Sequence, residues 1–372
     1  MLKIVNFVKD IIVHILSYMN KRKYLNNYEE CISINPKLGQ PAEGESEWLE
    51  KWRKYDKKVS PLSYRIFSRY IGPDINIMPM EICVNIVEPV LTPGYYASFY
   101  NDKNSFGLLY DKEDMPATYV RNIGGAYYDD DYNPINGELV DYIDSDEVIV
   151  KPSTESSGRG VALFAKQNGV FCDKQGNILT RELLDKEYRS DFIIQERFVQ
   201  SDYMAQFNPS SVNTIRISTY KDPSNGEVKY LRGIVRIGGV GAIVDNAHSG
   251  GRFIGIDDDG VFGSYVCDQV GNKFAMHGEI DFSKGEFVVP NFQQVKEFAV
   301  KISRRFIHHG LLALDIVLDK DNNPKMLEVN VQGFSAWLFQ FTSGTAFREY
   351  TDSVMDYCSK EIHKHSVKVV GN

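Results

Sequence analysis

The chain carries its most informative stretch at residues 311–330, LLALDIVLDKDNNPKMLEVN. Two apolar runs, residues 311–318 and 325–330, flank a polar segment rich in Asp and Asn, which tolerate the left-handed backbone of tight turns. This pattern predicts a β-hairpin. Each run also holds a carboxylate, Asp315 in the first and Glu328 in the second, where burial is costly unless another charge compensates it. The hairpin would bring the two acids side by side.

Two acids in such a position indicate a bound cation. Asn330 lies two residues beyond Glu328, so on a strand it projects to the same face and adds a neutral oxygen. A set of oxygen ligands suits Mg²⁺, which shares the rest of its coordination with phosphate and water. We therefore predict a magnesium site at Asp315, Glu328 and Asn330. The alternative is a pair of solvated acids at strand edges.

A second segment, residues 148–160 (VIVKPSTESSGRG), is an apolar strand that ends in Lys151 and continues into a small loop rich in Gly and Ser. Backbone N–H groups of such a loop can turn toward an anion, and the lysine adds positive charge, which suits a polyphosphate. The lysine precedes the glycines, so the segment is not a Walker A loop. A strand followed by an ordinary polar hairpin loop would give the same pattern.

A third segment, residues 211–220 (SVNTIRISTY), places Arg216 among apolar residues, and Arg236 has a similar setting in residues 230–237. A permanently charged guanidinium in apolar surroundings requires an anionic partner. A transferred phosphate or a substrate carboxylate would serve. A carboxylate of the protein itself is the alternative for each arginine.

The bulk composition narrows the class of protein. With 372 residues, 43% of them apolar and 25% charged, the chain can bury the cores of two or three lobes. A net charge of −8 and the lack of an extended Lys/Arg stripe argue against a nucleic-acid partner. Five cysteines without a CxxC pair fit reduced thiols in a cytoplasm, and the seven histidines form no HExxH motif.

The first ninety residues have apolar side chains at helical spacing, as in residues 48–55 and 62–70, and show no βαβ alternation. We read residues 1–90 as a mainly helical lobe. From residue 147 onward, short apolar runs separated by turn signals predict strands in antiparallel hairpins.

Two helices are also expected in this second part. Residues 295–309 have helical spacing, and residues 347–363 are predicted to form a closing helix. The fold class is therefore α+β.

Residues 1–24 read as an amphipathic helix with basic flanks. Lys9 and Asp10 interrupt the apolar run, which leaves it too short and too polar to span a bilayer or to act as a signal peptide. Two interpretations remain. The helix docks on the protein's own core, or it lies on an anionic membrane surface as a peripheral contact.

Taken in order, these segments resemble the ATP-grasp superfamily, whose members hold ATP between two α+β lobes. The resemblance implies that residues 91–200 form the first grasp lobe and residues 201–372 the second, behind the helical lobe. Many members begin instead with a Rossmann-like βαβ lobe that helps form the acceptor site. The acceptor of this chain is therefore not carried over from better-known ligases.

A narrower resemblance is to the sugar-transfer-associated ATP-grasp proteins of bacterial surface-polysaccharide loci. It rests on residues 86–91, 101–106, 211–216 and 244–251.

The resemblance implies roles for individual residues. Those that would bind ATP are Lys103, Lys151, Ser156, Ser157, Gly158, Gly160, Gln195, Glu196, Phe198 and Asp202. Asp315, Glu328 and Asn330 match the residues that hold Mg²⁺ in the family. Arg216 and Arg236, together with Lys151, would be the catalytic cations, and Asn246, Gly250 and Gly251 are expected to face the acceptor.

The implied activity is that of an ATP- and Mg²⁺-dependent carboxylate–amine ligase, acting on a sugar acid or another small-molecule or sugar-linked acceptor. Such an enzyme would be cytoplasmic, and would work at the inner face of the membrane if residues 1–24 lie on it. A kinase of a sugar hydroxyl and a nucleotide-binding module without turnover remain as alternatives. The sequence leaves the acid, the nucleophile and the oligomeric state open.

Overall fold

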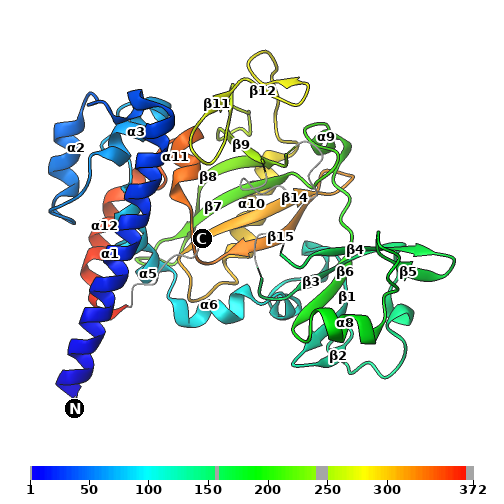
Figure 1. The fold of residues 1–372 in the computed structure, drawn as a ribbon. Coiled ribbons are helices and arrows are strands. Elements are labelled where there is room, and N and C mark those ends of the chain that lie inside the picture. The colour runs from blue at the N-terminus through cyan, green and yellow to red at the C-terminus, as the bar shows by residue number, and fades with distance from the viewer. Residues whose placement is uncertain (1, 156–158, 240–249, 366–372) are drawn as a thin grey trace.

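The computed structural model describes residues 2–155, 159–239 and 250–365. Figure 1 shows the N-terminal helices on one side, a large sheet in the centre and a smaller sheet on the other side. Of the polar residues singled out in the sequence, Lys151 and Gln195 lie on the smaller sheet, and Arg216, Arg236, Asp315, Glu328 and Asn330 lie on the larger one.

The N-terminal region is helical, as predicted. It consists of α1 (Leu2–Ile34), α2 (Glu45–Trp52), α3 (Leu62–Ile71), α4 (Met80–Ile82), a π-helical turn (Cys83–Val87) and α5 (Glu88–Leu91). Trp48 and Trp52 of α2 are fully buried, and their indole N–H groups donate to the carbonyls of Ile77 and Ile75 at 2.8 and 2.9 Å. These two bonds attach α2 to the segment that leads into α4.

The first helix continues ten residues past its predicted end at residue 24. It stops before Asn35 and Pro36, because proline disfavours helical backbone at the residue that precedes it.

Two helices (α6, Gly94–Asn101; α7, Phe106–Leu109) lead into a six-stranded sheet of order β2-β1-β6-β3-β4-β5. Its strands are β1 (Thr118–Ile123), β2 (Ala126–Tyr128), β3 (Glu147–Pro152), β4 (Ala162–Gln167), β5 (Val170–Cys172) and β6 (Phe192–Glu196). Helix α8 (Arg181–Glu187) buries Leu184 against this sheet. The sheet and α8 thus share a small core of their own.

The central sheet has seven strands in the order β11-β10-β9-β8-β7-β14-β15. They are β7 (Thr214–Lys221), β8 (Val228–Ile237), β9 (Arg252–Ile256), β10 (Val266–Cys267), β11 (Lys273–Phe274), β14 (Leu311–Leu318) and β15 (Pro324–Asn330). The predicted hairpin is confirmed, since β14 and β15 pair antiparallel with Asp315 opposite Glu328.

The remaining elements cover or border this sheet. They are α9 (Asp202–Ala205), the small hairpin β12 (Met276–His277) and β13 (Ile280–Asp281), α10 (Phe292–Ser303), α11 (Ala336–Thr342) and α12 (Thr351–Glu361). Helix α10 begins three residues earlier and ends six residues earlier than the predicted helix at residues 295–309. The closing helix begins later than predicted, after a 3₁₀ turn at Arg348–Tyr350.

The central sheet is buried on both faces, so β14 is apolar along nearly all of its length. Leu312 and Leu314 pack in the core that contains α10, whereas Leu311 and Ala313 pack in the core shared with α11, α12 and the N-terminal helices. Asp315 lies on the same face of β14 as Leu311 and Ala313, because alternate residues of a strand share a face. The face toward the N-terminal helices therefore becomes polar at one end.

The N-terminal helices are tied to this face by two polar contacts. The Gln340 side chain accepts from the Met78 N–H at 2.7 Å and donates to the Met78 carbonyl at 3.0 Å. Oε2 of Glu88 accepts from the Gly333 N–H at 3.3 Å, three residues after β15. Glu88 thus supports the chain directly beyond Asn330.

Glu88 should make the stability of the fold depend on pH. Burial raises its pKa from 4.5 to about 7, so between these values the unfolded chain releases a proton that the folded protein keeps. The wild type should lose about 2 kcal/mol relative to Glu88→Gln as the pH rises from about 5 to about 8. Urea unfolding of both proteins at each pH measures this difference. A difference that does not change with pH would contradict the assignment.

Candidate active site

The polar end of the central sheet is formed by neighbouring strands in register. Arg216 on β7 lies opposite Asp315 on β14, which lies opposite Glu328 on β15. Arg236 on β8 lies opposite Thr214, two residues before Arg216 on β7. Strand pairing alone therefore gathers side chains that are more than a hundred residues apart in the sequence.

Asp315 is the centre of this group. Its Oδ1 accepts from Arg216 Nε at 2.7 Å, and its Oδ2 accepts from Arg216 Nη2 at 2.7 Å, Arg236 Nη1 at 3.1 Å and Asn330 Nδ2 at 3.1 Å. The residue is only 2% exposed. Burial by itself would raise the pKa of Asp315, but the charges and hydrogen bonds of its neighbours outweigh burial and lower it. Asp315 is thus ionised and fixes both guanidinium groups.

The sequence left open whether the anionic partner of Arg216 and Arg236 is a ligand or a carboxylate of the protein. Both arginines pair with a carboxylate of the protein, Asp315. A carboxylate has about four lone-pair positions, and three of the four contacts fall on Oδ2. Asp315 therefore shares its charge with two cations before any ligand arrives.

Two lysines from the lobe of the six-stranded sheet belong to the same site, Lys151 on β3 and Lys103 in a 3₁₀ turn (Lys103–Ser105) that precedes β1. The Lys103 N–H donates to the Ser153 carbonyl at 2.9 Å, and Lys103 Nζ donates to the carbonyls of Glu155 at 2.8 Å and Ser153 at 3.3 Å. These bonds hold Lys103 against the chain that leaves β3, the strand that carries Lys151.

The two ammonium groups affect each other. Burial and the neighbouring charge of Lys103 lower the pKa of Lys151 to about 8, whereas Glu328 opposes this shift. Burial also lowers the pKa of Lys103, and Glu328 again acts in the opposite direction. Glu328 is thus the acid that both lysines sense across the site.

Four cations meet two carboxylates at this site among the described residues. They are Lys103, Lys151, Arg216, Arg236, Asp315 and Glu328, and the charges of Asp102 and Glu155 also act on Lys103. Four fixed cations gathered in a half-buried place attract an anion of several charges. A polyphosphate would relieve the repulsion between the two lysines.

The residues predicted to hold Mg²⁺ lie together. Glu328 is half-buried, and Asn330 uses Nδ2 for its bonds to Asp315 and the Ala313 carbonyl, which leaves its carbonyl oxygen as the ligand atom. Within residues 2–155, 159–239 and 250–365, no three His, Cys, Asp or Glu side chains form a metal-binding group. This set still fits Mg²⁺, which needs only one or two carboxylates when water and phosphate supply the other oxygens.

The residues predicted at the adenine end lie on and beyond β6. Gln195 is buried, and its Nε2 donates to the Pro116 carbonyl at 3.2 Å and to Thr118 Oγ1 at 3.3 Å. Glu196 is exposed, and its carboxylate accepts from the Ala117 N–H at 3.2 Å. Both side chains therefore hold the start of β1 against the end of β6.

Phe198 is half-buried beyond the end of β6, and Asp202 is exposed as the first residue of α9. The predicted acceptor residues Gly250 and Gly251 directly precede β9, and Gly250 is exposed with a φ of +81°. Asn246 lies outside the described residues.

The predicted phosphate loop is described only in part. Ser156, Ser157 and Gly158 lie outside the described residues. Gly160, which follows them, has a φ of +70°, and a Cβ at this position would lie 2.9 Å from Cγ of Pro152. Left-handed backbone and this close approach both require glycine where the loop returns to β4.

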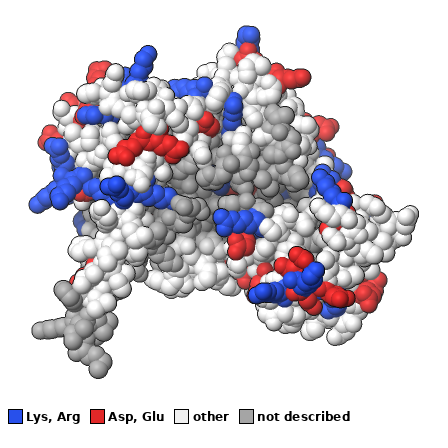
Figure 2. Space-filling view, in the orientation of Figure 1, with Lys and Arg blue, Asp and Glu red and all other residues white. Residues whose placement is uncertain are grey.

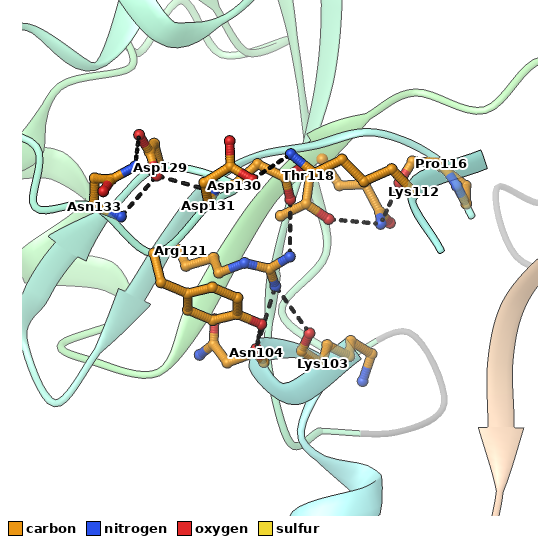
Figure 3. A network of polar contacts seen from close by, with 12 residues as sticks. Lys103, Asn104, Lys112, Pro116, Thr118, Arg121, Asp129, Asp130, Asp131 and Asn133 are labelled. Atoms are coloured by element: carbon orange, nitrogen blue, oxygen red, sulfur yellow. Dashed lines mark hydrogen bonds and ion pairs between the residues drawn. The ribbon is translucent and has the colours of Figure 1, made fainter. Parts of the chain in front are cut away.

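Arg121 on β1 is a site residue that the sequence reasoning missed (Figure 3). Its side chain is fully buried. Nη1 donates to the carbonyls of Lys103 at 3.2 Å and Asn104 at 3.4 Å, and Nη2 donates to Asp130 Oδ1 at 3.0 Å. The Tyr132 ring covers the guanidinium at 4.8 Å, and its hydroxyl donates to the Asn104 carbonyl at 2.7 Å. Arg121 thus anchors the backbone that presents Lys103.

The sequence did contain a signal for this residue. Arg121 sits within the strand-like run TYVRNI at residues 118–123, the same pattern that singled out Arg216. Its partner Asp130 comes from the acidic turn at residues 129–131.

Replacing Arg121 should weaken anion binding by the folded protein. Arg121→Met removes the bonds to the Lys103 and Asn104 carbonyls, and a charge-assisted bond is worth about 1.5 kcal/mol or more, so inorganic triphosphate should bind about tenfold more weakly. Calorimetry below the melting temperature measures this.

Lys112→Met is the matched control. Lys112 pairs with Asp130 at 3.0 Å and Asp131 at 2.6 Å, and within the described residues its side chain makes no bond to the backbone of Lys103. Equal weakening in both variants, or a lower melting temperature of Arg121→Met with unchanged affinity, would show that Arg121 only stabilises the lobe.

No curated protein matches the chain. Among solved structures, the D-alanine–D-alanine ligase from Bacillus anthracis is 13% identical with a TM-score of 0.36, over 72% of this chain and 69% of that chain. A D-cycloserine synthetase is 12% identical with a TM-score of 0.39, over 73% of each chain. The ADP complex of an N5-carboxyaminoimidazole ribonucleotide synthetase is 11% identical with a TM-score of 0.34, over 63% of this chain and 45% of that chain.

A family match covers far more of the sequence than any single motif. Residues 92–356 match the family described as sugar-transfer associated ATP-grasp, a span that begins after the N-terminal helices and includes both sheets. The predicted α+β grasp architecture is confirmed by this match, and the chain belongs to the sugar-transfer associated ATP-grasp family.

Proposed function

We propose that this protein is an ATP- and Mg²⁺-dependent carboxylate–amine ligase that activates a carboxylate as an acyl phosphate. We further propose that its acceptor is a sugar acid or a sugar-linked molecule of bacterial surface polysaccharide synthesis. The ATP-grasp family supports the first proposal, and the sugar-transfer association of this branch supports the second.

The observation that carries the proposal is the set of four fixed cations gathered around Asp315 and Glu328. Lys151 on β3 and Lys103 bonded to the chain after β3 come from one lobe, while Arg216 and Arg236 come from the central sheet. Such a site can bind a polyphosphate from both sides and stabilise the charge that develops during its transfer.

The proposed reaction has two steps. An oxygen of the substrate carboxylate bonds to the γ-phosphorus as its bond to the bridging oxygen of ADP breaks. The amine nitrogen then bonds to the carbonyl carbon of the acyl phosphate, the bond to phosphate breaks, and the nitrogen releases a proton to water. ATP is thereby converted to ADP and phosphate.

The residues of the chain would bind and orient in these steps. Lys103 and Lys151 hold the polyphosphate, and Arg216 and Arg236 stabilise the transferred phosphoryl group and the tetrahedral oxyanion. Because Asp315 fixes both guanidinium groups, they need little reorganisation when charge develops. A Mg²⁺ ion held by Glu328 and Asn330, with Asp315, would supply further neutralisation of the phosphate charge.

The first test separates the two acids. In calorimetry with a non-hydrolysable ATP analogue, wild-type binding should strengthen with Mg²⁺, and Glu328→Gln should lose most of that gain because it removes the acid not paired with an arginine in the described structure. Asp315→Asn should keep a larger share of the gain, yet lower turnover by about a hundredfold because it removes the carboxylate that orients both arginines. Absence of binding by the folded wild type would remove the nucleotide assignment.

The reaction class needs its own assay. ADP release that requires both an acid and an amine, together with hydroxamate formation when hydroxylamine replaces the amine, would identify a ligase. ADP release with a neutral sugar and no hydroxamate would identify a sugar kinase and overturn the ligase proposal.

Because of Lys151, the affinity for nucleotide and the proton uptake on binding should depend on pH. Its pKa of about 8 means that it loses its proton as the pH rises further, whereas a bound polyphosphate favours the charged form. Binding near pH 8.5 should therefore take up a proton, and affinity should fall by up to about tenfold per pH unit above this range.

Calorimetry in buffers of different ionisation enthalpy measures this proton uptake. Lys151→Arg is the matched control, because its side chain stays charged and should show neither effect. The same uptake in both proteins would assign the proton to another group.

A further inference from the structure

Helix α1 carries two apolar faces, and only one of them is covered. In its second half Tyr24, Tyr28 and Cys31 are buried in the core, and Asn20 donates to Asn85 Oδ1 of the π-helical turn at 2.9 Å. This part of the helix docks on the protein, which is one of the two interpretations of the sequence. The first half does not share this contact.

The first half of α1 extends beyond the rest of the molecule (Figure 1). Six of its large apolar side chains from residue 8 onward are 42–66% exposed: Val8, Ile11, Ile12, Ile15, Tyr18 and Met19. At about 100° of rotation per residue, these six fall within a stripe about 120° wide, on the side of the helix opposite to Tyr24, Tyr28 and Cys31. The stripe, which we call the outer stripe, therefore faces away from the protein.

A basic patch adjoins the outer stripe. The short connection after α2 carries Arg53, Lys54, Lys57 and Lys58, all exposed, and Arg22 of α1 is exposed on the same side as the stripe. The two segments are joined, since Lys21 Nζ pairs with Asp56 at 2.6 Å and donates to the Lys58 carbonyl at 2.7 Å.

Figure 2 shows Lys and Arg side chains gathered on this flank, beside the point where the helix leaves the body. Residues 21–23 and 53–58 together hold seven Lys/Arg and one acid, in a chain whose net charge is −8. This local excess of positive charge is opposite in sign to the net charge of the chain, and it lies beside the exposed outer stripe of α1.

We propose that the outer stripe and the basic patch dock this protein on an anionic phospholipid surface. The stripe would enter the boundary between headgroups and acyl chains, and the patch would face lipid phosphates. In the described part of the chain no helix is long and apolar enough to cross a membrane, so the contact is peripheral. A second copy of the chain fits less well, because pairing two stripes would bring two basic patches to one interface.

Vesicle sedimentation of the full chain tests the proposal. The protein should sediment with vesicles of phosphatidylcholine and phosphatidylglycerol, but weakly with phosphatidylcholine alone, and salt should release it because screening weakens the charge contribution. Deleting residues 1–24 would also remove buried Asn20 and Tyr24, so point substitutions are the sharper variants.

Three variants separate the contributions. The pair Ile11→Ser and Ile15→Ser should lower the vesicle partition coefficient by about tenfold or more, and the pair Lys57→Glu and Lys58→Glu should lower it on anionic vesicles. Ile34→Ser is the control, because Ile34 is an exposed apolar residue of α1 that lies outside the outer stripe. It should leave the partition coefficient unchanged.

Two results would overturn the proposal. One is equal sedimentation of the wild type and the Ile11→Ser, Ile15→Ser variant. The other is a doubled mass of the lipid-free wild type in light scattering that this variant abolishes, which would assign the stripe to a second copy. Binding of the ATP analogue should be the same in all these proteins, so failure here is distinct from failure of the proposed function.

Discussion

The site depends on one buried carboxylate that binds two arginines across three strands. Burying ions costs free energy, and the attraction between them repays it only when geometry is good and the remaining hydrogen bonds are made. Asp315 meets both conditions through Arg216, Arg236 and Asn330. Hydrophobic residues could fill the same space at least as stably. We therefore interpret the ion cluster as a preorganised set of charges and not as a source of stability. The register of the strands brings its members together.

The lobe of the smaller sheet contributes the two lysines of the site, and the larger sheet contributes Glu328, which acts on both of them. Lys103 and Lys151 repel each other and are partly desolvated, which is why the pKa of Lys151 is lowered, and Glu328 on the facing sheet offsets this only in part. An anion between the lobes would remove the repulsion and attract both sets of cations. The free energy of ligand binding would then also hold the lobes together. Arg121 matters to this balance because it sets where the backbone of Lys103 lies, although it comes from β1.

Features that depend on local pattern could be predicted from the sequence, and those that depend on distant partners could not. The β14–β15 hairpin followed from two apolar runs and an Asp/Asn turn, and it fixed Asp315 opposite Glu328. Which anion would pair with Arg216 stayed open, because Asp315 lies 99 residues away and meets it only through the β7–β14 pairing. Arg121 was missed although its run TYVRNI carried the same signal, because its role depends on bonds to the backbone carbonyls of Lys103 and Asn104, which a side-chain pattern does not show. The helical spacing over residues 1–24 did not separate two apolar faces, since only packing shows which one is covered.

The outer stripe and the basic patch, which form the proposed membrane contact, are connected to the site by the packing of the N-terminal helices. The second half of α1 shares one core with α11, α12 and one face of the central sheet. On that face β14 carries Asp315, and Glu88 of α5 supports the chain just after Asn330. A close-packed interior has low compressibility, so a displacement of one element is passed on to the elements packed against it. A molecule held on a lipid surface by α1 would therefore present its site in one orientation to that surface. A lipid-linked acceptor would then meet the site at a fixed distance from the lipid.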